Sequence, residues 1–394
     1  MQVSDGRTGQ HARFEDIEPR VKQLLDEKLI RREKGPYRSL SDAEVNAKLD
    51  RLLRANGLSN FRVESISRLA GGASKEQFLF TLVSGAGLEK RSEKLVLRMD
   101  PLEGVVETCR YREAELLQAF HGLLPLPEVR FIDGEGAHLG QPGVITSFVS
   151  GVTKPPAQSK VVVSGVGTSF TPEWRAKLVP QFIENLRQIH AFDWRKALLP
   201  HFQAPTAHRE QAALWQVNWW TRVWHDDHIP AYPLFTTGER WLREHLPSCD
   251  ELVVIHADYR TGNFMFDPES GKFTAILDWE LAHIGDFHEE LAWTLQRLFA
   301  GEPEGGKSYI CGLMTREDFL AQYEAASGRK VNPRTLAFYE ALGAYKCATQ
   351  LLGSSLAAAV RQNNHQDLLL TWLVPLGHTF LADMARVIKA EKNL

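Results

Sequence analysis

The residues that could carry chemistry are concentrated in the stretch IHADYRTGNFMFD, residues 255–267. Asp258 and Asn263 stand five positions apart in it, and they follow a short apolar run that predicts a buried strand. A second apolar run ends in ILDWE, which places Asp278 at the end of the next predicted strand. Mg²⁺ prefers carboxylate and amide oxygens together with substrate phosphates. We therefore expect Asn263 and Asp278 to hold a divalent cation, and Asp258 to face the same space and accept a proton from an attacking hydroxyl.

The residues around Asp258 and Asn263 support the interpretation of this pattern as a functional site. A D-x-x-x-x-N spacing alone is expected by chance about once in a chain of this size. Here it follows an apolar run, includes a neighbouring His256, and precedes a further acid, Asp278, fifteen residues after Asn263. The alternative is that these polar side chains only cap turns, as Asp and Asn often do.

The elements that must position these residues divide the chain into three parts. Residues 1–57 are charged and helical, and Ser41 and Glu44 have the spacing of a capping box there. Residues 58–150 contain four short runs rich in β-branched and aromatic residues, with one predicted helix between them. Residues 151–394 are mainly helical, interrupted by a β-hairpin-like insert that carries the acidic residues. A small β-rich lobe beside a larger helical lobe predicts an α+β fold, with a ligand site where the lobes meet.

Composition excludes several classes of protein. The chain has 394 residues, 43% hydrophobic and 24% charged, as in soluble globular proteins. A net charge of -3 with no basic stripe gives no reason to expect a nucleic-acid partner. The four cysteines form no CxxC pair, which argues against a disulfide framework and a zinc site. The first twenty residues are too polar for a signal peptide, and the most apolar stretch, 342–360, contains Lys346 and predicts a core helix rather than a membrane span. We expect a cytoplasmic protein without a membrane partner.

HADYRTGN followed by ILDWE resembles the catalytic and metal-binding loops of the aminoglycoside phosphotransferase family, relatives of the protein kinases. The kinase signatures are H-R-D-x-x-x-x-N and D-F-G. The resemblance covers about residues 58–350 and is strongest over 252–293. It implies a protein-kinase-like two-lobed fold and ATP- and Mg²⁺-dependent phosphoryl transfer to a hydroxyl. It also implies Asp258 as the catalytic base, Asn263 and Asp278 as the metal ligands, and His256, counted with the catalytic residues, as the brace of the catalytic loop.

The small lobe should then hold the nucleotide. LAGGASKEQFLF places Gly71 and Gly72 between two predicted strands, where backbone amides could approach phosphate oxygens. Ser74 could donate a further hydrogen bond. A tight hairpin that binds no ligand would have the same sequence, so the assignment of this loop depends on the rest of the pattern.

A cation on the next strand completes the predicted nucleotide site. In EKLVLRMD, Lys94 and Arg98 share one face of the strand. Arg98 aligns with the lysine of the protein kinases; Lys94 is the alternative, and a solvated strand charge is the third possibility. Glu113 is in line with the apolar positions of the following helix, where a carboxylate is costly unless it is paired. We expect it to pair with Arg98, unless it lies at the margin of the stripe and reaches water.

Other assignments follow from the resemblance or from helix patterns. VITSFVSG implies the hinge, with Ser147, Phe148 and Val149 as contacts of the adenine ring. Glu280 could support a second metal or brace its loop, and Asp286 is expected to cap a helix that starts near His288.

The substrate end of the chain contains four tryptophans between residues 215 and 224. They are expected to be core residues or to line an apolar acceptor pocket. The near-neutral composition disfavours a polycationic aminoglycoside, and the sequence resembles more closely the branch related to acyl-CoA dehydrogenase-associated proteins, which implies a hydroxyacyl compound as acceptor. The alternatives are a pseudokinase that binds a nucleotide without transfer, and a helical interaction scaffold. GTP remains possible as the donor.

Overall fold

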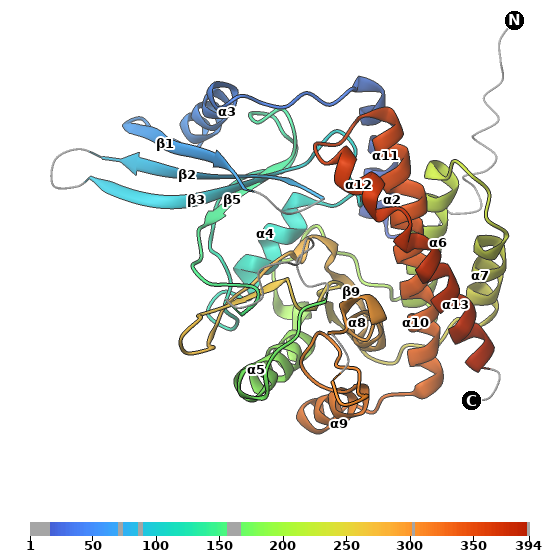
Figure 1. The fold of residues 1–394 in the computed structure, drawn as a ribbon. Coiled ribbons are helices and arrows are strands. Elements are labelled where there is room, and N and C mark those ends of the chain that lie inside the picture. Colours follow the sequence, from blue (N-terminus) through green and yellow to red (C-terminus); the bar gives the residue numbers. More distant parts are fainter. Residues whose placement is uncertain (1–15, 70–73, 86–89, 156–166, 302–303, 392–394) are drawn as a thin grey trace, which may run out of the picture.

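The computed structural model describes residues 16–69, 74–85, 90–155, 167–301 and 304–391. They form a small lobe built on one sheet and a larger, mainly helical lobe, as the sequence predicts (Figure 1).

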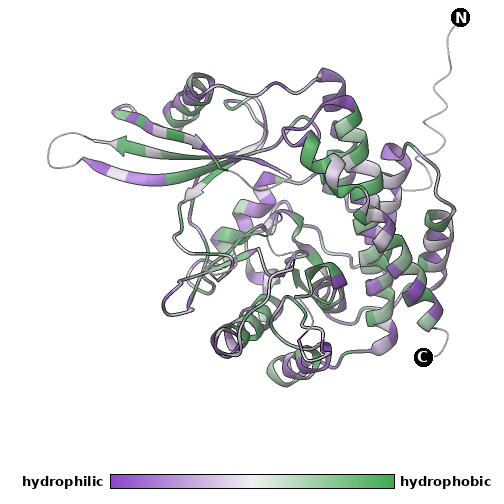
Figure 2. Ribbon diagram, viewed as in Figure 1, coloured by the Kyte–Doolittle hydropathy of each residue, from purple (hydrophilic) through white to green (hydrophobic). Residues whose placement is uncertain are grey.

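The small lobe is an antiparallel sheet of five strands in the order β1-β2-β3-β5-β4. The four predicted strands are present, and β4 is a fifth that the sequence analysis did not identify. Alternate side chains point to one face, so that Phe78, Phe80, Leu95 and Leu97 are buried together. In Figure 2, β3 begins hydrophilic and becomes hydrophobic where this core begins. The elements are β1 (Phe61–Arg68), β2 (Glu76–Ser84), β3 (Arg91–Met99), α4 (Arg110–Ala119), β4 (Val129–Asp133) and β5 (Gly143–Ser147).

The large lobe is a layered bundle of helices around one hydrophobic core. The stretch 342–360 is a core helix, as predicted, with a π-helical turn near its middle. The helices are α5 (Pro172–Ala191), α6 (Gln211–Asp227), α7 (Pro233–Glu244), α8 (Phe287–Thr294), α9 (Arg316–Ser327), α10 (Pro333–Ala348), α11 (Leu356–Arg361), α12 (Asp367–Leu373) and α13 (Leu376–Glu391). Shorter turns are η4 (Trp194–Lys196), η5 (Trp279–Leu281), η6 (Arg297–Phe299) and the π-helical η7 (Thr349–Ser355).

The strands of the large lobe correct the prediction of a simple hairpin-like insert. They are β6 (Leu252–Ile255), β7 (Phe264–Phe266), β8 (Phe273–Ile276) and β9 (His283–Asp286). β7 pairs with β8, but β6 pairs with the more distant β9. The insert is therefore one hairpin enclosed between the two strands of another pair, with residues 256–263 between β6 and β7.

The N-terminal extension is helical, as predicted, but it does not form a separate unit. It contains α2 (Pro19–Arg31), η2 (Arg32–Lys34) and α3 (Asp42–Ala55), and the capping box of Ser41 and Glu44 starts α3. Val45, Leu49 and Leu52 of α3 complete the core of the small sheet. Val21 and Leu25 of α2 belong to the core of the large lobe. The extension thus joins both lobes, with α3 beside the sheet and α2 among the helices (Figure 1).

One helical stretch, Asp367–Ala390, is long and apolar enough to cross a membrane by length and composition alone. Core helices of soluble proteins meet the same criteria. Its larger part, α13, packs against α7 and η7: Met384 lies where a side chain on Gly238 would stand, and Leu352 contacts Gly377.

A buried ion pair attaches α2 to the large lobe. The Lys28 ammonium contacts the Asp227 carboxylate at the end of α6, and both side chains are almost fully buried. Burial alone would lower the pKa of Lys28, but the charges of Asp227, Glu107 and Glu103 together raise it above its ordinary value. Asp227 also accepts a hydrogen bond from Ser354 Oγ of η7 at 2.6 Å.

We predict that Lys28→Met lowers the free energy of unfolding by about 3–5 kcal/mol, because it leaves Asp227 buried without its main counter-charge. Lys22→Met is the matched control, since Lys22 lies on the same helix and pairs with Asp26 at the exposed surface. The control should change stability by less than about 1 kcal/mol. Urea denaturation of both variants would test this, and equal losses would show that the pair does not hold α2 in place.

Candidate active site

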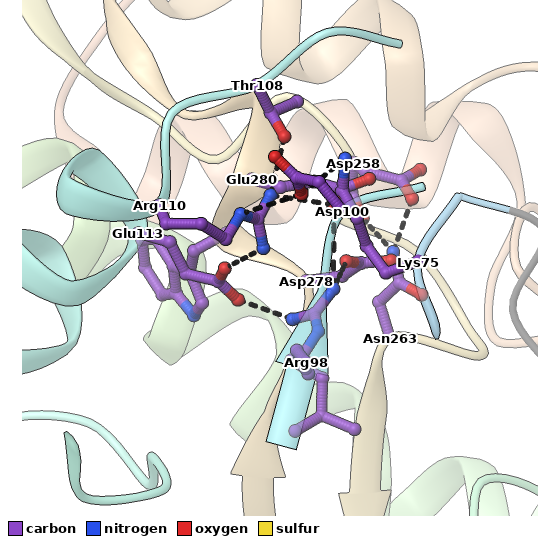
Figure 3. A network of polar contacts seen from close by, with 12 residues as sticks. Lys75, Arg98, Asp100, Thr108, Arg110, Glu113, Asp258, Asn263, Asp278 and Glu280 are labelled. Carbon is purple, nitrogen blue, oxygen red and sulfur yellow. Dashed lines mark hydrogen bonds and ion pairs between the residues drawn. The ribbon is translucent and has the colours of Figure 1, made fainter. Parts of the chain in front are cut away.

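The nested strands bring the segments predicted to be catalytic and metal-binding together at the junction of the lobes. Asn263 directly precedes β7, and its carbonyl accepts a hydrogen bond from the Leu277 amide at 2.7 Å, next to Asp278. Asn263 Nδ2 donates to the Asp258 carbonyl at 3.0 Å and also to the Asp258 carboxylate. Asp258, Asn263 and Asp278 thus lie around one space, as the sequence predicts (Figure 3).

His256 connects the two loops through both nitrogens of its ring. Nδ1 accepts a hydrogen bond from the Asp258 amide at 3.2 Å, so Nε2 carries the proton and donates it to the Leu277 carbonyl at 2.9 Å. Burial lowers the pKa of His256 to about 4, which keeps the ring neutral. The side chain is fully buried. His256, which the sequence analysis counted with the catalytic residues, is therefore a positioning residue and acts through its neighbours.

Both loops contain a residue in the left-handed backbone conformation, which residues other than glycine rarely adopt. Ala257 has φ 67° and Asp278 has φ 70°. The buried carboxylate of Glu290, on α8, accepts hydrogen bonds from the amides of His256, Ala257 and Tyr259. Burial raises the pKa of Glu290 to about 7, although these amides favour its charged form. The sequence analysis missed Glu290, and its only signal is an acid within the apolar stretch of a helix.

The Asp258 carboxylate is oriented by donors from three directions. Arg260 Nε donates to Oδ1 at 2.8 Å and Trp293 Nε1 donates to the same oxygen at 2.6 Å. Asn263 donates to Oδ2. The carboxylate is therefore fixed before any substrate binds, which is what catalysis by positioning requires. Arg260 and Trp293 were also missed, although Arg260 lies inside the catalytic loop.

Arg98 is the cation that contacts the loop of Asp278. It pairs with Glu113, as predicted, and it also donates to Asp278 Oδ1 at 2.5 Å. Glu113 is buried, so it does not reach water at the margin of its helix. Burial alone would lower the pKa of Arg98, but the charges of Glu113, Asp278 and Glu280 raise it above its ordinary value. Lys94, the alternative cation, is exposed, with its ammonium 6.0 Å from the centre of the Phe148 ring.

Further buried charges surround this pair, and the sequence analysis did not identify them. Lys75 Nζ lies 3.2 Å from Asp100 Oδ1, and Arg110 Nε lies 3.2 Å from the same oxygen. Arg110 also contacts Glu113 and, at 3.2 Å, Glu280 Oε2 (Figure 3). Glu280 therefore braces its loop in this structure. Hydropathy assigns such residues to the surface. The one signal in the sequence for a buried ion pair is that Arg110 stands three positions before Glu113 on the same helix.

The predicted nucleotide loop and hinge are described only in part. Gly71 and Gly72 lie outside the described residues, and Ser74, which follows them, is half-buried. Ser147 ends β5, and its Oγ accepts a hydrogen bond from the Glu128 amide at 2.9 Å. The Phe148 amide donates to the Lys94 carbonyl at 3.0 Å, and Val149 follows in the connector.

The connector between the lobes then passes close to the large lobe. Val152 exchanges two backbone hydrogen bonds with Phe266 of β7. Gly151 has φ 153°, and a Cβ there would lie 2.5 Å from Thr274 Oγ1, so the approach needs glycine. Asp286 caps α8 as predicted, because its side chain accepts a hydrogen bond from the His288 amide.

The residues of the site fit Mg²⁺ brought in by a nucleotide. Within the described ranges, no group of three or more His, Cys, Asp or Glu side chains could hold a metal ion. Asn263 offers an amide oxygen as a metal ligand, and Asp278 offers a carboxylate oxygen. Mg²⁺ is often held by one or two protein ligands, with phosphates and water completing its shell.

Comparisons with known proteins identify the family of the chain. The family model described as "Phosphotransferase enzyme family" matches residues 65–339. Acyl-CoA dehydrogenase family member 11 of Rattus norvegicus is 23% identical over 364 residues, which are 88% of this chain and 43% of that protein. The chain therefore spans less than half the length of this relative.

Solved structures show the same fold. A putative aminoglycoside phosphotransferase from Ralstonia eutropha has a TM-score of 0.60 at 19% identity, covering 86% of this chain and 98% of that one. Aminoglycoside phosphotransferase APH(4)-Ia, in a ternary complex with ADP and hygromycin B, has a TM-score of 0.52 at 17% identity, covering 82% and 95%. The chain belongs to the phosphotransferase enzyme family and has its protein-kinase-like, two-lobed α+β fold.

Proposed function

We propose that the protein catalyses ATP- and Mg²⁺-dependent transfer of a phosphoryl group to the hydroxyl of a small molecule. The observation that supports this most directly is the shared space of Asp258, Asn263 and Asp278, held together by the bonds of Asn263 to Asp258 and to Leu277. Because the transition state of phosphoryl transfer is loose, the protein contributes chiefly by positioning and by neutralising charge.

Each residue then has a defined task. Asn263 and Asp278 hold the metal, which when bound neutralises phosphate charge. Asp258 orients the acceptor hydroxyl and takes its proton late in the transfer. Arg98, at the end of β3, is the cation for the phosphates of the nucleotide, in the place where protein kinases have lysine. Arginine presents a planar fork rather than a point charge, so the phosphate contacts differ in detail from those of kinases.

For the acceptor we propose a hydroxylated acyl compound rather than an aminoglycoside. A polycationic substrate needs carboxylates that are not already paired. The two acids of α8, the helix that contacts Asp258 through Trp293, both have partners. Glu289 contacts the Lys346 ammonium at 2.8 Å, and Glu290 binds backbone amides. Lys346 Nζ lies 5.2 Å from the centre of the Trp293 ring and 5.4 Å from that of Trp220. Trp220, Trp293 and Lys346 are themselves buried, so neither acid of α8 is available to a polycation.

The tryptophans of α6 serve mainly as core. All four are buried, and Trp219 and Trp220 stack with their ring centres 5.1 Å apart. This supports the core alternative, and only Trp220 is linked to the catalytic aspartate, through Lys346 and Trp293.

A pseudokinase remains the second candidate, because Arg98 lies on the metal ligand Asp278 in this structure. Single-turnover measurements with γ-labelled ATP separate the two functions. Tight nucleotide binding without transfer to any hydroxylated metabolite or to water would favour the pseudokinase.

We predict that Asp258→Asn lowers the rate of transfer by about 10²–10⁴-fold, since it removes the proton acceptor. Nucleotide affinity should stay within about twofold, because Asp258 does not contact the phosphates. Asp267→Asn is the matched control: Asp267 caps the turn between β7 and β8, with a hydrogen bond from Ser270 at 2.8 Å. Release of ADP in an acceptor screen would measure the rate, and near-full activity of Asp258→Asn would refute the role.

We also predict that Asp278→Ala weakens the binding of Mg²⁺·ADP about tenfold or more, a difference of about 1.4 kcal/mol. Binding of ADP in the presence of a chelator should change much less, because the lost oxygen serves the metal. Calorimetric titrations with and without Mg²⁺ would compare the two. The metal assignment is wrong if both affinities fall equally.

A further inference from the structure

We infer that Arg110 is a positioning residue for the nucleotide. It keeps Glu113 and Glu280 neutralised, so that Arg98 is free to leave Asp278 and contact phosphate. This inference rests on the proposed function, since it assigns a part of the same site to a residue that touches neither substrate nor metal.

The contacts show how the two arginines divide the acids. Glu113 Oε1 pairs with Arg98, and Glu113 Oε2 pairs with Arg110. Glu280 Oε2 lies 3.2 Å from Arg110 Nη2, 3.6 Å from Arg98 Nη2 and 3.8 Å from Lys75 Nζ. Figure 3 shows Arg110 between Glu113 of the small lobe and Glu280 of the large lobe. One guanidinium therefore joins acids from two lobes.

The balance of charge in this cluster makes Arg98 the cation that can exchange one partner for another. Three cations face four carboxylates in this cluster, and all of these side chains except Asp278 are less than 15% exposed. Asp278, 30% exposed, is the one that faces the nucleotide space. The cluster comprises Lys75, Arg98, Arg110, Asp100, Glu113, Asp278 and Glu280.

Binding of a metal-bound nucleotide requires an exchange of partners. Asp278 Oδ1 cannot fully serve both the Arg98 guanidinium and a metal ion. When Arg98 turns to phosphate, Glu280 keeps Arg110 and Lys75, and Glu113 keeps Arg110, so no buried carboxylate loses all of its counter-charges. Without Arg110, Glu113 would depend on Arg98 alone, and Glu280 would keep only Arg98 and Lys75, whose Nζ lies 3.8 Å away. A buried carboxylate left alone is costly. Arg98 would then be held back from the nucleotide.

The test is the affinity of the intact chain for Mg²⁺·ADP, measured by calorimetry. Arg110→Met should weaken binding about tenfold or more. Arg110→Met combined with Glu280→Gln removes one acid with one cation. It should recover about threefold of the lost affinity, because only Glu113 then still depends on Arg98. Arg110→Lys keeps the charge but not the fork that reaches two acids, so it should lose about threefold.

Arg112→Met is the matched control. Arg112 is also buried on α4, but it pairs with Glu18 of the extension at 3.1 Å, away from the charge cluster. It should lower the melting temperature and leave the affinity within twofold of the wild type.

The outcomes separate the two levels of the proposal. Failure of the wild type to bind Mg²⁺·ADP would reject the proposed function itself. A wild type that binds, with Arg110→Met equal to it or with no recovery from Glu280→Gln, would reject only the role of Arg110. If Arg110→Met does not fold, Arg110→Lys decides the question, and an affinity equal to the wild type rejects the inference.

Discussion

The active site depends on one buried imidazole that joins two strained loops. His256 accepts a hydrogen bond from the Asp258 amide and donates one to the Leu277 carbonyl, directly before Asp278. Ala257 and Asp278, next to these contacts, are left-handed, and such residues cost about 1–3 kcal/mol each unless their surroundings compensate. A protonated ring could not accept the Asp258 amide. The burial that holds the pKa of His256 near 4 therefore also keeps Asp258 and Asp278 in register.

That burial comes from contacts that reach across to the small lobe. The His256 ring lies 4.5 Å from the ring of Trp279, which in turn lies 5.1 Å from Phe120 directly after α4. The same helix carries Glu113 and Arg110, whose carboxylate and guanidinium contact Arg98 and Glu280. Apolar contact is not directional, whereas ion pairs have defined geometry. The aromatic rings thus bring α4 onto the metal loop, and the charges set its position there.

The sequence predicts the parts of this arrangement that depend on the spacing of residues close together in the chain. The five-residue separation of Asp258 and Asn263, the capping box at Ser41 and the place of Glu113 on an apolar stripe are all local patterns. The pairing of β6 with β9 is not local, since the inner hairpin stands between them in sequence.

The buried charges escaped prediction for a related reason. Lys75, Arg110 and Lys28 read as surface residues from their hydropathy, and only their partners keep them inside. Several of those partners are far along the chain: Asp227 lies 199 residues from Lys28, and Glu280 lies 170 residues from Arg110. A charged residue in a single sequence carries no mark of such a partner.

The extension gives the two lobes a second covalent connection. The lobes are connected once through the segment that contains Gly151, and a second time between α2 and α3, where the Tyr37 amide donates to the Gln362 carbonyl at 2.7 Å. Near the second connection, Glu103 of the small lobe accepts a hydrogen bond from Arg361 at 2.8 Å. A body attached at two points rotates about the line through them. A rotation of one lobe relative to the other would therefore disturb least the contacts close to that line, such as that of Glu103 with Arg361.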